Sequence, residues 1–534
     1  MSEIFITGHR NPDMDSLCAA YAYAQLKNSI DRVNHYNAVR CGHISDNIKA
    51  QFSITGVEPP PYKRDVKAKV LDVMRTDVKA VQSNLPVYEL MRIMKKYNKR
   101  PSVVPLFDKN TFKGLLSIDA ITDWFLNDHI GEYPRYEITL ENIERVLKCK
   151  PLKRGKPEVF NAPILSGASH VQEHPDALIV MPYGEKYVKL AMSYKVPAIV
   201  LTDVKGDLGK LDFSGYEGSI FISDIETTET IRRLRLAQSI ESLLGQQGDA
   251  LQINELFDDA KERLSSSNLR GLAVMDGDKY VGFVTRRCFL RKPRYDVILV
   301  DHNEPNQSIR GVEEAVVREI IDHHRLDAPK TDLPIFIDSE PVGSTCTIIY
   351  QLYLRNSIIP DITTAKVMLA GILADTILLK SPTTTGLDIL SVEKLAPLAG
   401  VSDFRSFGKA MFEKVEGLGT RDPEQVILED MKTYKENGLV IGVSQCEVPT
   451  LDDLADYSAK YMASLEKIRK ANNMDWVLLM ITDVMKYRSM LISSGHKLEK
   501  RLSYEAVAEH VFDMKDAVSR KKQLLPEIIF AING

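Results

Sequence analysis

Residues 8–16 read GHRNPDMDS and follow a short β-prone run at residues 4–7. They place one imidazole and two carboxylates, those of His9, Asp13 and Asp15, in a loop where a buried strand should end. Hard divalent ions bind carboxylate oxygens, and an added imidazole favours borderline ions such as Mn²⁺ or Co²⁺. The stretch therefore predicts part of a metal site.

The same stretch also fits an ordinary strand-to-helix turn. A helix is predicted at about residues 17–26, Asn11-Pro12 is typical of a turn, and Asp15 or Ser16 would cap the helix. Residues elsewhere in the chain have to decide between the two interpretations.

The composition is that of an ordinary soluble protein. Hydrophobic residues make up 44% of the chain and charged residues 27%, which indicates neither a disordered nor a membrane-embedded protein. The longest apolar runs are far shorter than the roughly 18 residues of a membrane span, and no signal peptide is visible, so we expect a cytoplasmic protein. The net charge of −4 gives no general attraction to nucleic acid or to an anionic membrane. The six cysteines form no CxxC pair, which argues against a zinc ribbon or a disulfide framework.

A weak internal repeat lies between residues 66 and 294. Each copy has a helical stretch, an apolar strand, an Asp, a Gly six residues later and a hydroxyl three residues after the Gly. The matching residues are Asp108, Gly114 and Ser117 in the first copy, and Asp276, Gly282 and Thr285 in the second. Because matching spacing at two places seldom arises by chance, the repeat predicts two copies of one structural module.

These two segments resemble paired CBS (cystathionine β-synthase) modules, which bind adenine nucleotides in the cleft between them. The resemblance implies AMP, ADP or a diadenosine polyphosphate as a regulator. The residues implied in nucleotide binding are Arg100, Ser117, Arg270 and Thr285. The acidic or amide residue that usually follows the hydroxyl by three positions is Ala120 in one copy and Cys288 in the other, although Asp119 lies one position away. A structural CBS pair that binds no nucleotide is therefore the alternative.

The segment between the two copies alternates strand-like and helix-like stretches at residues 177–181, 185–194 and 197–202. This alternation is typical of a small α/β unit with parallel strands. Residues 184–203 resemble part of a DRTGG domain, a module found with CBS pairs.

Polar residues recur after apolar runs in the second half of the chain. Residues 295–300 end in Asp301, and residues 319–321 end in Asp322-His323-His324. A third run, VMLAGILA at residues 367–374, ends in Asp375, although its length also fits a helix. The carboxyl ends of parallel strands line one crevice, where ligands bind.

One sheet edge would then gather two imidazoles and four carboxylates. These belong to His9, Asp13, Asp15, Asp301, His323 and Asp375. Such a set can hold two divalent ions about 3.5–4 Å apart that share a bridging carboxylate. A water between two cations loses its proton near neutral pH, and the resulting hydroxide can attack phosphorus.

The motifs GHRNPDMDS, VDHNE, IIDHHR and LADTILLKSPTTT resemble the signatures of the DHH phosphoesterase superfamily, and specifically of the family II (manganese-type) inorganic pyrophosphatases. The resemblance implies an α/β fold, with a DHH domain whose mostly parallel sheet is flanked by helices, and a DHHA2 α/β domain. It implies hydrolysis of pyrophosphate to two phosphates by a metal-bridged hydroxide at a di- or trinuclear site. Two Mn²⁺ or Co²⁺ ions per subunit and Mg²⁺ with the substrate are the implied cofactors. The six residues above match the metal ligands, Asp13 and Asp15 are also implied in catalysis, and His324 matches a substrate-contacting histidine and candidate proton donor.

A compact cationic stretch, SRKKQ at residues 519–523, precedes a strand-like run at residues 527–530. It resembles the DHHA2 motif whose Arg and first Lys grip the phosphates, which implies this role for Arg520 and Lys521, with Lys522 beside them. Arg and Lys donors complement an anion that two metals cannot fully neutralise. A solvated charge run is the alternative. A further substrate lysine of the family falls on Lys432.

The resemblances divide the chain into seven parts. The DHH domain would take residues 1–65 and 295–411, the CBS modules 66–125 and 246–294, the DRTGG-like domain 126–245, a hinge 412–422 and the DHHA2 domain 423–534. A homodimer is expected from the pairing of CBS modules.

Two other functions stay open: a DHH phosphodiesterase or exopolyphosphatase acting on polyphosphate, oligonucleotides or cyclic dinucleotides, and a nucleotide sensor with a relict catalytic fold. The first usually carries a GGGH-type motif, which is absent from this sequence.

Overall fold

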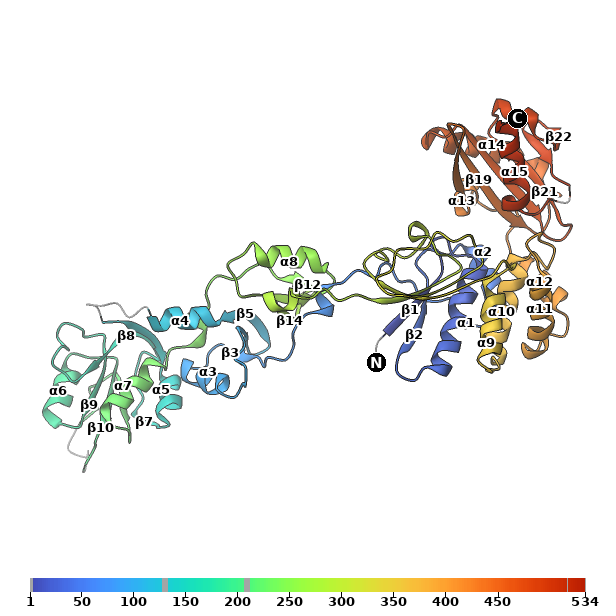
Figure 1. Ribbon diagram of the computed structural model, residues 1–534. Coiled ribbons are helices and arrows are strands. Elements are labelled where there is room, and N and C mark those ends of the chain that lie inside the picture. The colour runs from blue at the N-terminus through green and yellow to red at the C-terminus, as the bar shows by residue number, and fades with distance from the viewer. Residues whose placement is uncertain (1–2, 127–132, 206–211, 516, 534) are drawn as a thin grey trace. The chain divides into compact units, whose positions relative to one another are not determined.

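The computed structural model describes residues 3–126, 133–205, 212–515 and 517–533 (Figure 1). The chain folds into two compact units, one of Met1–Lys67 with Arg294–Gly534 and one of Ala68–Pro293. Among the described helices, none is long and apolar enough to cross a membrane.

The first unit contains a sheet of five parallel strands in the order β17-β16-β15-β1-β2. Its strands are β1 (Glu3–Thr7), β2 (His35–Val39), β15 (Asp296–Val300), β16 (Val316–Asp322) and β17 (Phe336–Ser339). Strand β1 pairs with β15 in the register Ile4↔Asp296, so the segments before and after the second unit share one sheet. The inner strands are buried apolar runs, as expected of parallel strands covered on both faces.

Helix α1 starts the site. It spans Met14–Ile30 and begins at the N-cap residue Asp13, whose carboxylate accepts a hydrogen bond from the Ser16 backbone N–H at 2.9 Å. The hydroxyl of Ser16 accepts a hydrogen bond from the Asp13 N–H at 3.1 Å, which completes a capping box. The predicted cap at Asp15 or Ser16 is therefore wrong, and Asp15 lies buried in the first helical turn.

The remaining helices of this domain are α2 (Asp46–Phe52), α9 (Thr345–Arg355), α10 (Ile362–Asp375), α11 (Gly386–Leu398) and α12 (Phe404–Phe412). Helix α10 contains the apolar run 367–374, so Asp375 ends a helix and does not follow a strand. The Asp361 carboxylate caps α10 by accepting from the Thr364 N–H at 2.8 Å, and the Ala, Leu and Met residues of the run favour a helix. The run is apolar all round because α10 contacts α1, α9 and α11.

The C-terminal part of the first unit is a second α/β domain with the sheet order β18-β19-β20-β21-β23-β22. Its elements are α13 (Pro423–Glu429), β18 (Lys432–Glu436), β19 (Leu439–Val448), α14 (Leu454–Ala471), β20 (Trp476–Asp483), β21 (Arg488–Ser493), β22 (Glu505–Ala508), β23 (Val511–Asp513) and α15 (Leu525–Asn533). The predicted strand at 527–530 is wrong, because the π-helical turn Arg520–Leu524 continues directly into α15. One apolar face of α15 is buried against the sheet, which four residues of sequence do not distinguish from a strand.

The second unit contains two similar three-stranded sheets and one larger sheet. The first small sheet has β3 (Val81–Gln82), β4 (Val103–Asp108) and β5 (Thr111–Ser117), with α3 (Val87–Met94) and α4 (Ile118–Leu126); the second has β12 (Leu251–Gln252), β13 (Gly271–Asp276) and β14 (Lys279–Thr285), with α8 (Phe257–Ser265). The repeated order strand, helix, strand, strand matches the predicted pair of modules.

The larger sheet of the second unit has the order β6-β8-β9-β10-β11-β7. Its elements are β6 (Arg135–Thr139), α5 (Leu140–Leu147), β7 (Pro151–Lys153), β8 (Val159–Ser166), β9 (Leu178–Pro182), α6 (Glu185–Ser193), β10 (Ala198–Thr202), β11 (Ser219–Ile222) and α7 (Thr227–Arg235). Strands β8 to β11 are parallel, as the alternation of strand and helix predicts.

Candidate metal and substrate site

The six predicted metal ligands come together at the carboxyl edge of the five-stranded sheet. They fall into two groups whose ligand atoms lie within 4.8 Å of one another: His9, Asp13 and Asp301 in one, and Asp15, His323 and Asp375 in the other. The loop after β1 supplies His9, the start of α1 supplies both early carboxylates, and the ends of β15, β16 and α10 supply the rest. Asp301, His323 and His324 form a third such group.

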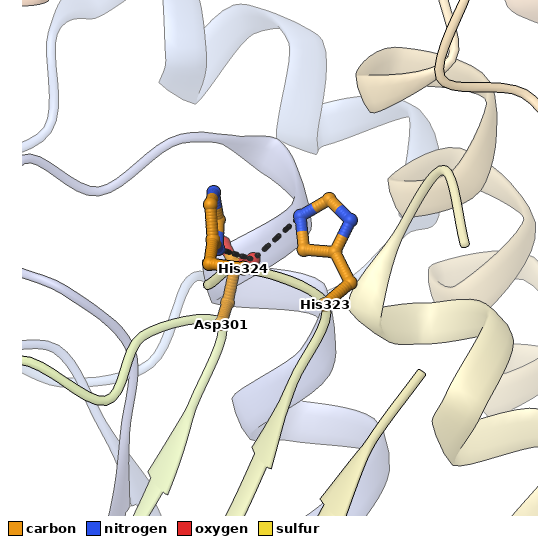
Figure 2. A group of neighbouring side chains, drawn as sticks. All are labelled: Asp301, His323 and His324. Carbon is orange, nitrogen blue, oxygen red and sulfur yellow. Dashed lines mark ion pairs between the residues drawn. The ribbon is translucent and has the colours of Figure 1, made fainter. Parts of the chain in front are cut away.

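The carboxylate of Asp301 lies between two imidazoles. Its Oδ2 is 3.4 Å from His9 Nε2 and its Oδ1 is 3.5 Å from His323 Nε2. Figure 2 shows Asp301 beside the two consecutive histidines, with dashed lines marking the ion pairs. Asp301 has a left-handed backbone with φ of 60°, a costly conformation for a non-glycine residue that often occurs at functional sites. One carboxylate oxygen thus faces each group, as a bridging ligand requires.

The buried carboxylates of the cluster repel one another, and positive charge between them would stabilise their ionised forms. Burial and the nearby Asp15 and Asp13 carboxylates raise the pKa of Asp301 to about 8. Burial also raises the pKa of Asp375 well above its usual range. Burial opposes protonation of His9, yet Asp13 and Asp301 raise the His9 pKa well above 6.5. Four neighbouring carboxylates and two imidazoles suit divalent cations such as Mn²⁺ or Co²⁺, which would supply the missing charge.

The N-terminus of α9 holds Asp15 in place. Its carboxylate accepts hydrogen bonds from the Ser344 hydroxyl and the Thr345 backbone N–H, both at 2.6 Å, and from the Cys346 N–H at 3.2 Å. A Cβ at Gly371 of α10 would lie 3.1 Å from Asp15 Oδ1 and 2.6 Å from Cys346 Sγ, so the close approach of α10 needs glycine there. Donors at a helix N-terminus stabilise a carboxylate and fix its orientation.

The second histidine of the pair, His324, is held by a buried acid. Its Nδ1 lies 2.8 Å from Asp322 Oδ1, and Asp322 in turn accepts a hydrogen bond from Asn303 Nδ2 at 2.5 Å. Burial, with His323 and Lys521 nearby, lowers the pKa of His324 to about 4, although the hydrogen bond to Asp322 opposes this. The contact with Asp322 occupies Nδ1 and fixes the orientation of the imidazole.

The predicted cationic residues gather in the C-terminal domain of the same unit. Arg520 is buried, and its Nη1 lies 2.8 Å from Asp430 Oδ2 and donates to the Val443 carbonyl at 3.4 Å. Burial and the Lys521 charge lower the pKa of Lys432, which begins β18. The Lys522 ammonium donates to the Pro382 carbonyl at 3.0 Å, directly linking this domain to the domain of the five-stranded sheet. The charge of Lys521 acts on both His324 and Asp375.

The four predicted nucleotide residues all belong to the second unit. Ser117 Oγ accepts a hydrogen bond from the Ala120 N–H at 3.1 Å, and Thr285 Oγ1 lies 3.6 Å from Cys288 Sγ. Arg270 pairs with Asp119, to which its Nη2 donates at 3.0 Å. Arg100 is exposed before β4. These contacts place one predicted residue from each module at one end of its edge strand.

Sequence reasoning missed the residues that support the ligands. Asp388 is fully buried and accepts hydrogen bonds from Gly343, Thr347 and Thr385. Its position three residues after Thr385 is a capping-box signal at the start of α11, visible in the sequence. The link from Asp388 to the loop before α9 joins residues far apart in the chain and has no sequence signal.

Comparison with known proteins identifies two family matches and several relatives. The family "DHH family, N-terminal domain" matches residues 3–372, and "DHHA2 domain" matches residues 409–529. A cobalt-dependent inorganic pyrophosphatase of Clostridium perfringens is 28% identical over 98% of this chain and 97% of its own. A manganese-dependent inorganic pyrophosphatase of Methanocaldococcus jannaschii is 36% identical over 47% of this chain and 87% of its own.

Among solved structures, the CBS and DRTGG domains of the regulatory region of Clostridium perfringens pyrophosphatase, complexed with the activator diadenosine tetraphosphate, match 41% of this chain and 100% of theirs. That match has 16% identity and a TM-score of 0.36.

Proposed function

This chain belongs to the DHH family, among its metal-dependent inorganic pyrophosphatases, and we propose that it hydrolyses pyrophosphate at the six-ligand cluster of the first unit. The reaction adds one water across the phosphoric anhydride bond and releases two phosphates. The observation that carries the assignment to this cluster is the Asp301 carboxylate, with His9 on one oxygen and His323 on the other.

The two ligand groups would each hold one Mn²⁺ or Co²⁺ ion, with Asp301 shared between them, and Mg²⁺ would arrive with the substrate. When bound, such ions neutralise phosphate oxygens and make a coordinated water more acidic. The chain's own contribution is to fix the ligands. Asp15 is oriented by three donors at the start of α9, and Asp301 accepts from the Thr345 hydroxyl at 3.0 Å.

We assign substrate contacts to His324, Lys432, Arg520 and Lys521. A pyrophosphate ion carries three or four negative charges, and guanidinium and ammonium donors bind the oxygens that the metals leave unpaired. His324 would contact the leaving phosphate through Nε2, because Nδ1 is held by Asp322. The cationic group is supported by the Lys521 charge, which acts to lower the pKa values of both His324 and Asp375.

The test is release of phosphate from pyrophosphate with Mn²⁺ or Co²⁺, compared with release from a dinucleotide such as cyclic di-AMP. Rapid turnover of pyrophosphate and at least about a hundredfold slower release from the dinucleotide would support the proposal; about 2.7 kcal/mol of transition-state stabilisation separates them at that ratio. Turnover of the dinucleotide alone would refute it.

The second unit would regulate the enzyme by binding adenine nucleotides. Its repeated modules support this proposal, as does similarity to the Clostridium perfringens relative over nearly the whole chain, which includes this unit. AMP, ADP and diadenosine tetraphosphate should change the rate of pyrophosphate hydrolysis, with reciprocal coupling in binding. If none of the three ligands alters the rate of hydrolysis, the second unit has a structural role only.

We also propose a cytoplasmic homodimer. The six described cysteines are all free thiols, a state that the reducing cytosol preserves. Sedimentation velocity and cell fractionation test these two statements, and a monomer or a secreted protein would refute them.

A further inference from the structure

The two modules of the second unit close their edge strands in different ways. Strand β5 is the edge of the sheet β3-β4-β5, and β14 is the edge of β12-β13-β14. An edge strand presents backbone N–H and C=O groups that need partners. The repeat places Leu115 on β5 and Phe283 on β14 at equivalent positions, each directly after the repeated glycine.

The backbone N–H and C=O groups of Phe283 are paired with the backbone of Arg75. The Phe283 N–H donates to the Arg75 carbonyl at 3.1 Å, and the Arg75 N–H donates to the Phe283 carbonyl at 2.8 Å. A Cβ at the preceding Gly282 would lie 2.7 Å from the Arg75 carbonyl oxygen. Both backbone groups of Phe283 are therefore occupied by main-chain hydrogen bonds. A ligand could bind these groups only if the chain around Arg75 moved away.

The backbone N–H and C=O groups of Leu115 are instead paired with a side chain, that of Gln247. The Leu115 N–H donates to Gln247 Oε1 at 2.8 Å, and Gln247 Nε2 donates to the Leu115 carbonyl at 3.3 Å. A Cβ at Gly114 would lie 2.7 Å from the same Oε1. Gln247 is an exposed residue, so rotation of its side chain would free both groups of Leu115 without breaking any main-chain pairing.

The carboxamide of Gln247 has the same pattern of one acceptor beside one donor as the edge of adenine, where N1 or N7 accepts and the N6 amino group donates. A cavity of about 90 Å³ adjoins it, lined by residues of both modules, including Phe112, Lys113, Gly271 and Ala273. The Phe112 ring stacks on Tyr280 of the other module at 4.4 Å between ring centroids. Lys113, whose ammonium lies 3.4 Å from Glu241 Oε1 in this structure, adds a cation suited to a phosphate.

We infer that the Leu115 edge is an adenine-nucleotide site, and that Gln247 occupies the position of the base when no nucleotide is bound. The inference rests on the proposed regulation by adenine nucleotides and adds the site, its internal competitor and its asymmetry. The Leu115 edge is open to exchange, and the Phe283 edge is closed. Because Gln247 must leave before the base binds, it lowers the apparent affinity by the fraction of time it occupies the site.

The test is calorimetric titration of AMP into the full-length chain and its Gln247→Ala variant. Removal of the competitor should strengthen AMP binding by about threefold to tenfold. Gln247→Met, which keeps the length of the side chain but cannot form either hydrogen bond, should do the same. Gln246→Ala, a change of the neighbouring exposed glutamine, should leave the affinity as in the wild type.

Pyrophosphate hydrolysis without nucleotide, measured on the same samples, checks folding and separates this inference from the proposed function. Hydrolysis should be retained in all variants, because Gln247 belongs to the second unit and the proposed metal ligands belong to the first. Unchanged or weaker AMP binding in both Gln247 variants would overturn the inference, as would absence of AMP binding in every protein. A gain for GMP without one for AMP would overturn the assignment to adenine.

Discussion

The Asp388 carboxylate accepts a hydrogen bond from the Gly343 backbone N–H at 2.8 Å, across 45 residues of sequence. The same carboxylate accepts from the Thr347 hydroxyl at 2.6 Å. Gly343 and Thr347 flank Ser344 and Thr345, whose donors orient Asp15. Asp388 therefore acts on Asp15, a proposed metal ligand, through the start of α9 and does not itself belong to the cluster.

Asp388→Asn should weaken Mn²⁺ binding by about 10–100-fold, the usual cost of losing a group that orients metal ligands. The amide turns one acceptor into a donor that faces other donors. It should also lower the free energy of unfolding by about 1–3 kcal/mol. Equilibrium dialysis with Mn²⁺ and denaturant unfolding measure the two effects.

Asp361→Ala is the matched control, because the Asp361 carboxylate also accepts hydrogen bonds at the start of a helix, as the N-cap of α10. This control should lower the free energy of unfolding and leave the Mn²⁺ affinity as in the wild type. Equal losses of Mn²⁺ affinity in both variants would show that Asp388 acts only through general stability.

Arg520→Lys should reduce kcat/KM for pyrophosphate by about 10–100-fold, because a lysine cannot reproduce the two-pronged donor geometry of the guanidinium. Arg520 has two nitrogens near the Asp430 carboxylate, Nη1 at 2.8 Å and Nη2 at 3.3 Å. The bound Mn²⁺ should stay constant. Arg469→Lys, at an arginine of α14 that pairs with Glu466, is the control, and equal kinetics of the two variants would contradict the role of Arg520.

Burial and the nearby Asp430 carboxylate together raise the pKa of Glu447 on β19 to about 7. In the unfolded chain this carboxyl has its ordinary pKa of about 4.5, so the folded state binds more protons than the unfolded state between pH 4.5 and pH 7. Its contribution to stability is therefore fully present below about 4.5 and is lost as the pH rises through about 7.

Glu447→Gln should remove this dependence and gain about 1–3 kcal/mol of stability relative to wild type between pH 5 and pH 8. Urea unfolding at a series of pH values measures the gain. Glu393→Gln, at an exposed position of α11, should follow the wild-type profile. A constant difference between wild type and Glu447→Gln across this pH range would disprove the assignment.

The sequence predicts the fold class and the cluster well because both depend on short local patterns. Runs such as 296–300, which are short and rich in β-branched residues, favour a buried strand, and the polar residues after them share one edge. Asp375 reaches the same place from the end of a helix, since eight apolar residues fit a fully packed helix as well as a strand.

The supporting contacts could not be predicted. Ser344 meets Asp15 across 329 residues, and Gln247 meets Leu115 across 132. No local pattern encodes such pairs, since they depend on how whole elements pack. The start of α15 was likewise missed because a π-helical turn precedes it.

We propose that side chains from the two chain segments before and after the second unit in the sequence together hold two metal ions around the Asp301 carboxylate. The most direct measurement is the Mn²⁺ content of the wild-type chain and of Asp301→Asn after dialysis. We predict two ions per wild-type chain and at most one in Asp301→Asn, with loss of pyrophosphate hydrolysis. Two ions and wild-type turnover in Asp301→Asn would contradict the account.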